Sequence, residues 1–479
     1  MSGYLVERAR GRSLAVLLLP LALVATFIAT GAAVVQPKLM LGGTVAICVL
    51  LLAWRAPVAN LTVLLFLTAV VPYGVQNRYG IGGGINSPGL LPSDLFLLAG
   101  IAVALLQLPS LPLDRRRWLY TVGILAFLAV VAIQFLHGLR LGHQRSTVGQ
   151  EGRVLLGFGT FLIALPLLKH APSRRRLLIA LTGLAVTLGA WGMLQWLGHL
   201  SYGAAGDVGV RSGVAQTSNG VGQLQGGEFG FPVAIIVCAS CLIMGELRSL
   251  RARAALFVAV ALNAASCLVT FERSFWIDAL VGIAFVTLLA PGIKRVKAAA
   301  IVCALGAVAL VALSVVSPAT LTTAQQRLNS ISGYSTDSSV RYRLVESGFV
   351  YQRVATHPTT GSGLGASIFW GQPWAQVRPR AQSFSHDGYL WLSWKIGVPA
   401  ATLLTLLLGG TLLSRRRYGE TDLSNAVRRG AQGAILGLLI ATVTFSSFSQ
   451  LSIAPVMGLL LALAISPEIK RRAALRLAA

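Results

Sequence analysis

The sequence predicts an all-α integral membrane protein with about 12–14 transmembrane helices and one long external loop that holds a further helix. Three observations carry this prediction. Of the 479 residues, 55% are hydrophobic and 11% are charged, whereas a soluble domain carries about 25% charged residues. Apolar runs long enough to cross a bilayer recur along the whole chain. Basic residues gather in short clusters between those runs.

About fourteen apolar stretches are candidate transmembrane helices, each of which needs roughly 17–25 residues. Stretches 39–54, 57–72 and 93–108 are short, so about twelve or thirteen spans is the alternative. The first stretch is too long for a signal-peptide core, and we expect it to be retained. We expect a single membrane domain over residues 1–479. The candidates are 14–35, 39–54, 57–72, 93–108, 118–136, 153–169, 174–197, 228–246, 252–271, 274–290, 297–317, 387–413, 430–450 and 452–466.

The basic residues predict the orientation of the chain. Most of the 40 lysines and arginines fall between alternate stretches, as at Arg115 to Arg117, Arg174 to Arg176 and Arg415 to Arg417. Cytoplasmic loops of membrane proteins are enriched in Lys and Arg. The pattern therefore predicts cytoplasmic termini, and it explains the net charge of +25 better than nucleic-acid binding does.

The cysteines and the missing motifs limit the chemistry. Cys238 and Cys241 have the spacing of redox or zinc sites, but inside an apolar stretch we interpret them as core packing. The sequence has no Gly-Lys-Ser/Thr loop, no His-Glu-x-x-His and no Asp-x-Asp pair. We expect neither a metal nor a cofactor.

Three polar segments, 73–92, 201–228 and 318–385, are predicted to lie outside. In the longest, Asp337 and the serines after it could cap a helix over 340–355. Its residues Leu344, Gly348, Tyr351 and Ala355 would share one face. A glycine-rich turn follows Pro358. A loop of this length is more often functional than not.

His386 stands where this loop enters a very apolar stretch. Histidine is the side chain with an ordinary pKa near neutrality, so His386 is a candidate general base. An interfacial histidine that reaches toward water is the alternative. The nearby aromatic residues could stack on sugars or belong to an interfacial belt. They are Trp370, Trp374, Tyr389, Trp391 and Trp394.

Two positions carry arginines on the predicted outer side. Arg273 lies between two apolar stretches, where a phosphate partner or an ion pair with Glu272 or Asp278 would explain it. Arg341, Arg343 and Arg353 lie along the loop helix, where contacts with solvent or lipid phosphates are the alternatives.

Three acidic residues lie near the outer helix ends. Asp94, Glu228 and Asp278 could assist an acceptor, although capping and hydration explain them as well.

These motifs, in this order, resemble those of the O-antigen ligase and polymerase superfamily. Glu272-Arg273-Ser274 corresponds to a Ser-Arg-Gly-like motif after a mid-chain span. Arg343 precedes Pro358-Thr-Thr-Gly-Ser-Gly by about fifteen residues, as an external-loop arginine does in the family. His386-Asp387 corresponds to a His-Asn-like pair. The resemblance covers residues 269–399, including the loop 318–385, and it departs at Glu272, at Asp387 and at Lys395, near where a Glu is common.

The resemblance implies a GT-C-like glycosyltransferase in the plasma (inner) membrane of a bacterium, acting in cell-envelope polysaccharide biosynthesis. Its donor would be a glycan on a polyprenyl pyrophosphate such as undecaprenyl pyrophosphate, with its active site on the external face. Arg273 and Arg343 would bind the pyrophosphate, and His386 would deprotonate an acceptor hydroxyl. Arg341, Asp387 and Asp278 are possible accessory residues. The acceptor, a glycan, lipid or protein, stays open, as does the choice between ligase and polymerase.

A transporter or flippase for a polysaccharide precursor is the alternative function. Transporters show related halves, broken helices and ionisable groups near the bilayer midplane. Here the unusual residues gather on one side, which favours the transferase. A non-catalytic scaffold would leave Arg273, Arg343 and His386 unexplained.

Overall fold

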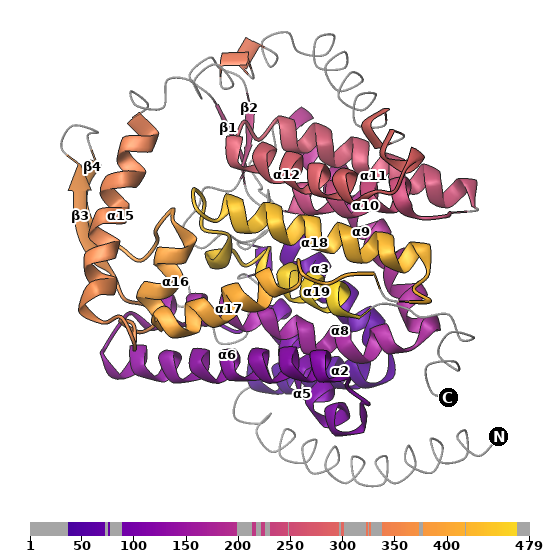
Figure 1. The fold of residues 1–479 in the computed structure, drawn as a ribbon. Coiled ribbons are helices and arrows are strands. Elements are labelled where there is room, and N and C mark those ends of the chain that lie inside the picture. The colour runs from indigo at the N-terminus through magenta and orange to yellow at the C-terminus, as the bar shows by residue number, and fades with distance from the viewer. Residues whose placement is uncertain are drawn as a thin grey trace.

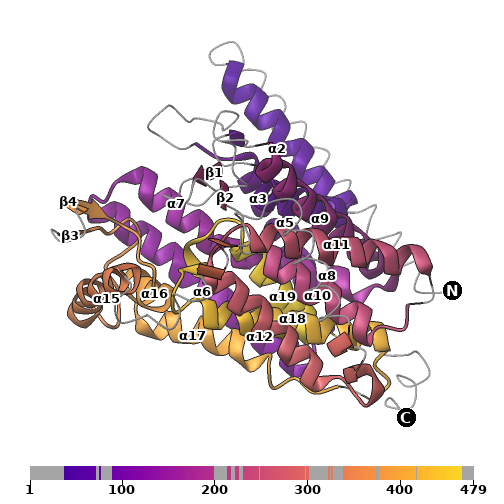
Figure 2. The same ribbon diagram turned by 90° about the horizontal axis from the view of Figure 1, so that it is seen from above.

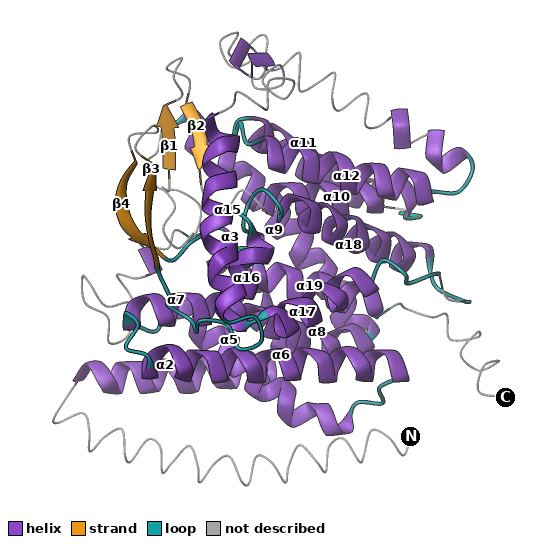
Figure 3. Ribbon diagram, turned by 60° about the vertical axis from the view of Figure 1, so that its left-hand side comes forward, coloured by secondary structure: helices purple, strands orange, loops and turns teal. Residues whose placement is uncertain are grey.

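The computed structural model describes residues 37–466 except 72–74, 77–88, 199–212, 217–221, 226–229, 248, 297, 301–321, 324, 327–337, 373–376 and 417. Within these residues the chain is a helical bundle with two short β-hairpins at its edge (Figure 1, Figure 3). The all-α polytopic class predicted from the sequence is confirmed. The predicted span 14–35 and most of 297–317 lie outside the described residues.

Helices α3 (Pro57–Ala69) and α5 (Pro92–Gln107) each begin at a proline, which lacks the N–H that a first helical turn leaves unpaired. They pack on each other and on α2 (Pro37–Arg55). Asp94 of α5 accepts a hydrogen bond from the Leu91 backbone N–H at 2.8 Å. This contact fixes the start of α5.

The next segments pack beneath the glycine-rich turn that follows Pro358. They are α6 (Arg115–Arg140), α7 (Arg145–Leu156), the 3₁₀ turn η2 (Gly157–Gly159), α8 (Thr160–Lys169) and α9 (Ala171–Leu197). Asp114 caps α6 by accepting from the Arg117 backbone N–H at 2.8 Å. Arg153 Nε lies 2.8 Å from the buried Asp94 carboxylate, so α7 and α5 are joined by an ion pair.

The centre of the bundle is α18 (Asp422–Ala441), which packs against α10 (Gly230–Met244), α12 (Arg273–Leu289) and α19 (Ala454–Ile465). Helix α11 (Leu250–Leu268) packs on α9 and α10. A Cβ on Gly433 of α18 would lie 2.8 Å from the carbonyl oxygen of Gly282 in α12. Small residues thus let these two apolar helices approach closely.

The remaining elements come from residues 338–410. Helix α15 (Ser338–Thr356) is followed by the antiparallel strands β3 (Ile368–Gln372) and β4 (Val377–Gln382), then by α16 (Gly388–Ile396) and α17 (Val398–Gly410). These elements lie together at one end of the bundle in both perpendicular views (Figure 1, Figure 2). Gly397 separates α16 from α17 with a φ of 85°, a backbone conformation that glycine adopts at little cost.

Among the residues that the structure describes, five helical segments are long and apolar enough to cross a membrane, judged by length and composition. They are Pro92–Ser110, Arg115–Arg140, Arg145–Lys169, Ala171–Leu197 and Leu250–Leu268. Shorter apolar helices accompany them, among them Pro57–Ala69, Gly230–Met244 and Ala454–Ile465. The protein is therefore a multi-pass membrane protein, and its exact number of spans stays a prediction.

The structure also departs from the sequence-based expectations. The predicted span 430–450 is displaced, because Thr421 caps α18 by accepting from the Ser424 backbone N–H and the helix ends at Ala441. Two polar segments that were expected to be irregular contain paired strands, namely β3–β4 and the pair β1 (Gly213–Gln216) and β2 (Gly222–Gln225).

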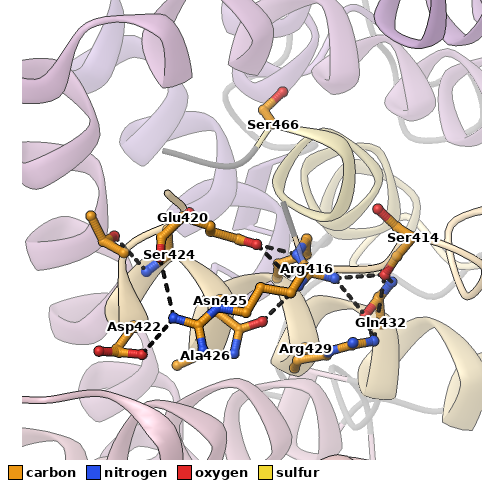
Figure 4. A network of polar contacts seen from close by, with 12 residues as sticks. Ser414, Arg416, Glu420, Asp422, Ser424, Asn425, Ala426, Arg429, Gln432 and Ser466 are labelled. Atoms are coloured by element: carbon orange, nitrogen blue, oxygen red, sulfur yellow. Dashed lines mark hydrogen bonds and ion pairs between the residues drawn. The ribbon is translucent and has the colours of Figure 1, made fainter. Parts of the chain in front are cut away.

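The link between α17 and α18 closes over a buried polar network (Figure 4). The Arg428 guanidinium lies 3.0 Å from Glu420 Oε1 and donates to Asn425 Oδ1 at 2.6 Å and to the Ser414 carbonyl at 2.6 Å. Gln432 donates to the Thr411 carbonyl at 2.5 Å. Since its charges are paired within the fold, this network holds the link in place.

Candidate functional site

The site begins at the N-terminus of α16, where Asp387 caps the helix. The Oδ1 atom of Asp387 accepts from the backbone N–H groups of Tyr389 at 2.9 Å and Leu390 at 3.0 Å. The cap fixes the residue before it, His386, at the mouth of the helix.

His386 is held by Glu346, a residue that the sequence analysis did not single out. Oε2 of Glu346 lies 2.8 Å from His386 Nδ1 and accepts the His386 backbone N–H at 2.8 Å. The Glu346 side chain is fully buried and comes from the middle of α15. In the sequence, Glu346 could be noticed only as the acidic residue of the predicted loop helix, one turn after Arg343.

Aromatic rings enclose the imidazole edge-on. The Tyr342 ring centroid lies 5.8 Å from that of His386, and the Phe384 centroid lies 5.1 Å away, both in T-shaped geometry. Trp370 of β3 packs on Tyr342 with centroids 5.0 Å apart. These contacts orient the ring while leaving 27% of the His386 side chain exposed.

The tryptophans near His386 are core residues. Trp370, Trp391 and Trp394 are buried, so within this fold they neither face an interface nor offer a free ring to a sugar. Tyr389 is half-buried and donates its hydroxyl to the Leu439 carbonyl at 2.7 Å. Trp374 lies outside the described residues.

The arginines expected to bind phosphate come from two helices. Arg343 lies half-buried on α15, one turn before Glu346, and Arg341 is exposed on the same helix. Arg273 is the first residue of α12 and is half-buried. Arg343 therefore lies on the same helix as Glu346, the residue that is hydrogen-bonded to His386.

Helices α12 and α16 begin at the same place on the bundle. Phe275, in the first turn of α12, packs on Phe445 with ring centroids 5.3 Å apart. The backbone N–H of Gly388, the first residue of α16, donates to the Thr442 carbonyl at 2.9 Å. Both contacts fall just after α18, so Arg273 and His386 lie at one end of the bundle.

The acidic candidates have different surroundings. Asp94 caps α5 and pairs with Arg153, so the capping explanation is confirmed for it. Asp278 is fully buried in α12 against Gly437, and neither carboxylate oxygen has a hydrogen-bond partner among the described residues. Asp278 is therefore a buried carboxyl group inside the bundle and not an exposed one at a helix end. Glu228 lies outside the described residues.

The glycine-rich turn after Pro358 ties α15 to α16. Gly361, Gly363 and Gly365 have φ values of 68°, 81° and 79°, which disfavour any other residue. The Ser362 N–H donates to the Trp394 carbonyl at 2.7 Å, and the Val398 N–H donates to the Pro358 carbonyl at 2.7 Å. The turn thereby fixes the end of α15 relative to α16.

A buried ion pair between Lys395 and Glu151 contacts the same turn. Lys395 Nζ lies 2.6 Å from Glu151 Oε1 and donates to the Ala366 carbonyl at 2.5 Å. The other carboxylate oxygen of Glu151 accepts the Gly365 N–H at 2.6 Å. Lys395, a departure from the family pattern, thus links α16, α7 and the turn.

The His, Cys, Asp and Glu side chains are the residues that could share a metal ion. Among the described residues, no group of three or more His, Cys, Asp or Glu side chains is placed to hold a metal ion. Cys238 and Cys241 are free and buried in α10.

Comparison with known proteins identifies one region of the chain. No curated protein sequence matches the chain. Residues 256–405 match the family model described as O-Antigen ligase. This stretch contains α12, α15, the glycine-rich turn and α16, the elements that carry Arg273, Arg343 and His386. This region of the chain is therefore similar to the O-antigen ligase family.

Proposed function

We propose that this protein transfers a glycan from a polyprenyl-pyrophosphate carrier to an acceptor hydroxyl on the external face of a bacterial plasma membrane. The observation that carries the proposal is the His386 imidazole, which is partly exposed at the mouth of α16 and hydrogen-bonded through Nδ1 to the buried Glu346 at 2.8 Å. The O-antigen ligase match over 256–405 supports the reaction class.

In the proposed mechanism His386 acts as the general base. The acceptor hydroxyl gives its proton to Nε2 of His386 while its oxygen bonds to the anomeric carbon of the donor sugar. The bond from that carbon to the pyrophosphate oxygen breaks, and the pyrophosphate leaves with the electron pair. Arg273 and Arg343 stabilise the charge that develops on the leaving oxygen.

Three further residues, Asp387, Arg341 and Asp278, would have accessory roles that depend on where they lie. Asp387 sets the place of His386 through the α16 cap. Exposed Arg341 is placed to attract the anionic donor toward Arg343 on the same helix. Asp278 lies deeper in α12, the helix that begins with Arg273, and would act only through the packing of that helix.

The test is transfer from a purified polyprenyl-pyrophosphate glycan in detergent. We expect His386→Ala to abolish transfer while its level in the membrane stays normal, because the ring supplies a proton acceptor. His357→Ala is the matched control, since His357 is exposed in the same external region. Transfer by His386→Ala at the wild-type rate would remove the general-base role.

A transporter of the lipid-linked precursor is the second candidate. The fully buried Asp278 within an apolar helix favours it, since such groups mark transport pathways in membranes. Movement of the precursor across a sealed vesicle, unchanged by His386→Ala and lost in Asp278→Asn, would establish it.

A further inference from the structure

The contact between Glu346 and His386 determines which ring nitrogen carries the proton. A buried ionised carboxylate accepts hydrogen bonds and has none to donate. Glu346 Oε2 lies 2.8 Å from Nδ1, so Nδ1 must be the protonated nitrogen of the neutral ring. The lone pair then lies on Nε2.

The other ring nitrogen, Nε2, is not used by the described part of the fold. Nε2 of His386 has no hydrogen-bond partner among the described residues, and 27% of the side chain is exposed. An imidazole that donates through one nitrogen to a carboxylate becomes more basic at the other. The arrangement therefore matches what a general base requires.

His386 lies 40 positions after Glu346 in the sequence, yet the described hydrogen bonds of Glu346 are all with His386. Its Oε2 accepts both the Nδ1–H and the backbone N–H of His386, each at 2.8 Å. Its Oε1 is buried and has no hydrogen-bond partner among the described residues. A carboxylate taken out of water needs strong donors, and the described donors on Glu346 all belong to His386.

Among the described residues, the other groups that contact the His386 ring are aromatic and uncharged. Tyr342 of α15 and Phe384 meet the ring through aromatic edges, and Asp387 directs Oδ1 toward the backbone of α16. Glu346 is therefore the ionised group that is hydrogen-bonded to the imidazole.

We propose that Glu346 is the positioning residue of His386. It fixes the tautomer with the proton on Nδ1, aims Nε2 outward, and stabilises the imidazolium that forms when Nε2 accepts a proton. Glu346 acts through His386, and it does not touch the substrate. This role deepens the proposed transferase function and rests on it for its catalytic meaning.

The first experiment reads the ring directly, without any transfer assay. Diethylpyrocarbonate modifies neutral imidazoles, and peptide mass spectrometry of the purified full-length protein resolves each histidine. We expect the pH midpoint for modification of His386 to fall by about one unit or more in Glu346→Gln, because a charge-assisted hydrogen bond is lost. The midpoint of exposed His357 should not move, nor should that of His386 in the matched control Glu246→Gln.

The second measurement uses the unmutated protein, in case Glu346→Gln fails to fold. Nitrogen-15 NMR of histidine-labelled protein distinguishes the two neutral tautomers, and His386→Ala identifies the signal of His386. We expect the tautomer protonated on Nδ1. A ring protonated on Nε2, or a midpoint that stays unchanged in a folded Glu346→Gln, would overturn the proposal.

Kinetics then separate the two proposals. If both hold, Glu346→Gln lowers kcat about ten- to hundredfold with the KM for donor and acceptor unchanged. A shifted midpoint together with active His386→Ala would sink the general-base mechanism and leave the positioning role intact. An unshifted midpoint together with inactive His386→Ala would sink the positioning role alone.

Discussion

At the scale of single residues, the charges buried around the site work in pairs. Lys395 meets Glu151 at 2.6 Å, and Glu346 meets two donors of His386 at 2.8 Å. Moving one ion out of water costs several kcal/mol. A buried charge offsets this cost only when it has a partner inside the fold. The effect of a substitution therefore depends on whether its partner is still charged.

We expect Lys395→Met to destabilise the protein by about 3–5 kcal/mol, because it leaves Glu151 charged and buried. The double variant Glu151→Gln/Lys395→Met should recover much of that loss. Lys294→Met is the control, since Lys294 pairs with the exposed Glu246 at 3.7 Å and should cost less than about 1 kcal/mol. Thermal unfolding in detergent measures all three. A double variant as unstable as the sum of the singles would contradict the pairing.

The arginine pair gives the next prediction. Lysine keeps the charge of Arg273 or Arg343 but loses the two parallel hydrogen bonds that a guanidinium offers to a phosphate. Each Arg→Lys variant should lower transfer about ten- to hundredfold, and the double should cost less than the sum if both bind one group. Arg353→Lys, exposed on the same helix as Arg343, should transfer normally. Full activity of both single variants would rule out a shared pyrophosphate site.

The sequence could point to His386 and to the arginines, because each is a polar group at an unusual place beside an apolar stretch. It could not point to Glu346, since an acidic residue on an external helix is ordinary. The burial of Glu346 depends on how α15 lies on α16. The partner of Lys395 was equally hidden, because Glu151 is 244 positions away in the chain.

At the scale of the elements, the glycine-rich turn links the helix that carries Arg343 and Glu346 to the helix that follows His386. Gln134 of α6 donates to the Thr360 carbonyl at 2.6 Å, and His143 Nε2 lies 3.1 Å from the Ser362 carbonyl oxygen. The turn is therefore bound to α6 and the start of α7 as well as to α16.

We expect Gly363→Ala to lower both stability and transfer. Gly363 has a φ of 81°, and an added Cβ would lie 3.1 Å from the His137 ring and 3.2 Å from Gly138. The left-handed conformation alone costs an alanine about 1–2 kcal/mol. Gly348→Ala is the matched control, because nothing lies within 4 Å of its added Cβ and alanine favours a helix. Equal unfolding temperatures for the two variants would mean that the turn tolerates a side chain.

Elements with a strong local signal were predicted, and those set by tertiary contacts were not. Long apolar runs such as 118–136 and 174–197 coincide with α6 and α9. The helix predicted over 340–355 coincides with α15. The start of α18 was missed because the charged Arg428 was placed in the loop before the span, whereas it lies inside α18 and is buried against Glu420, which precedes the helix. The hairpin β3–β4 has no clear alternation of polar and apolar residues to reveal it.

At the scale of the whole molecule, the candidate site depends on both halves of the chain. The match to the O-antigen ligase family spans residues 256–405, yet Gln134, His143 and Glu151 hold the turn from outside that stretch. We therefore expect the ligase-like region 269–399 to need the N-terminal helices, as part of one membrane domain.

The orientation of the whole molecule is the last prediction, and the charge pattern carries it. The segment α16–α17 should cross the membrane once, with the site outside and the Arg415 to Arg417 cluster inside. Ser367 and Tyr418 lie on either side of this segment, and both are exposed. In a variant whose five native cysteines are replaced, Ser367→Cys should react with an impermeant maleimide in intact cells. Tyr418→Cys should react only after the membrane is opened. The reverse pattern would put His386 on the cytoplasmic side, where an external lipid-linked donor could not reach it.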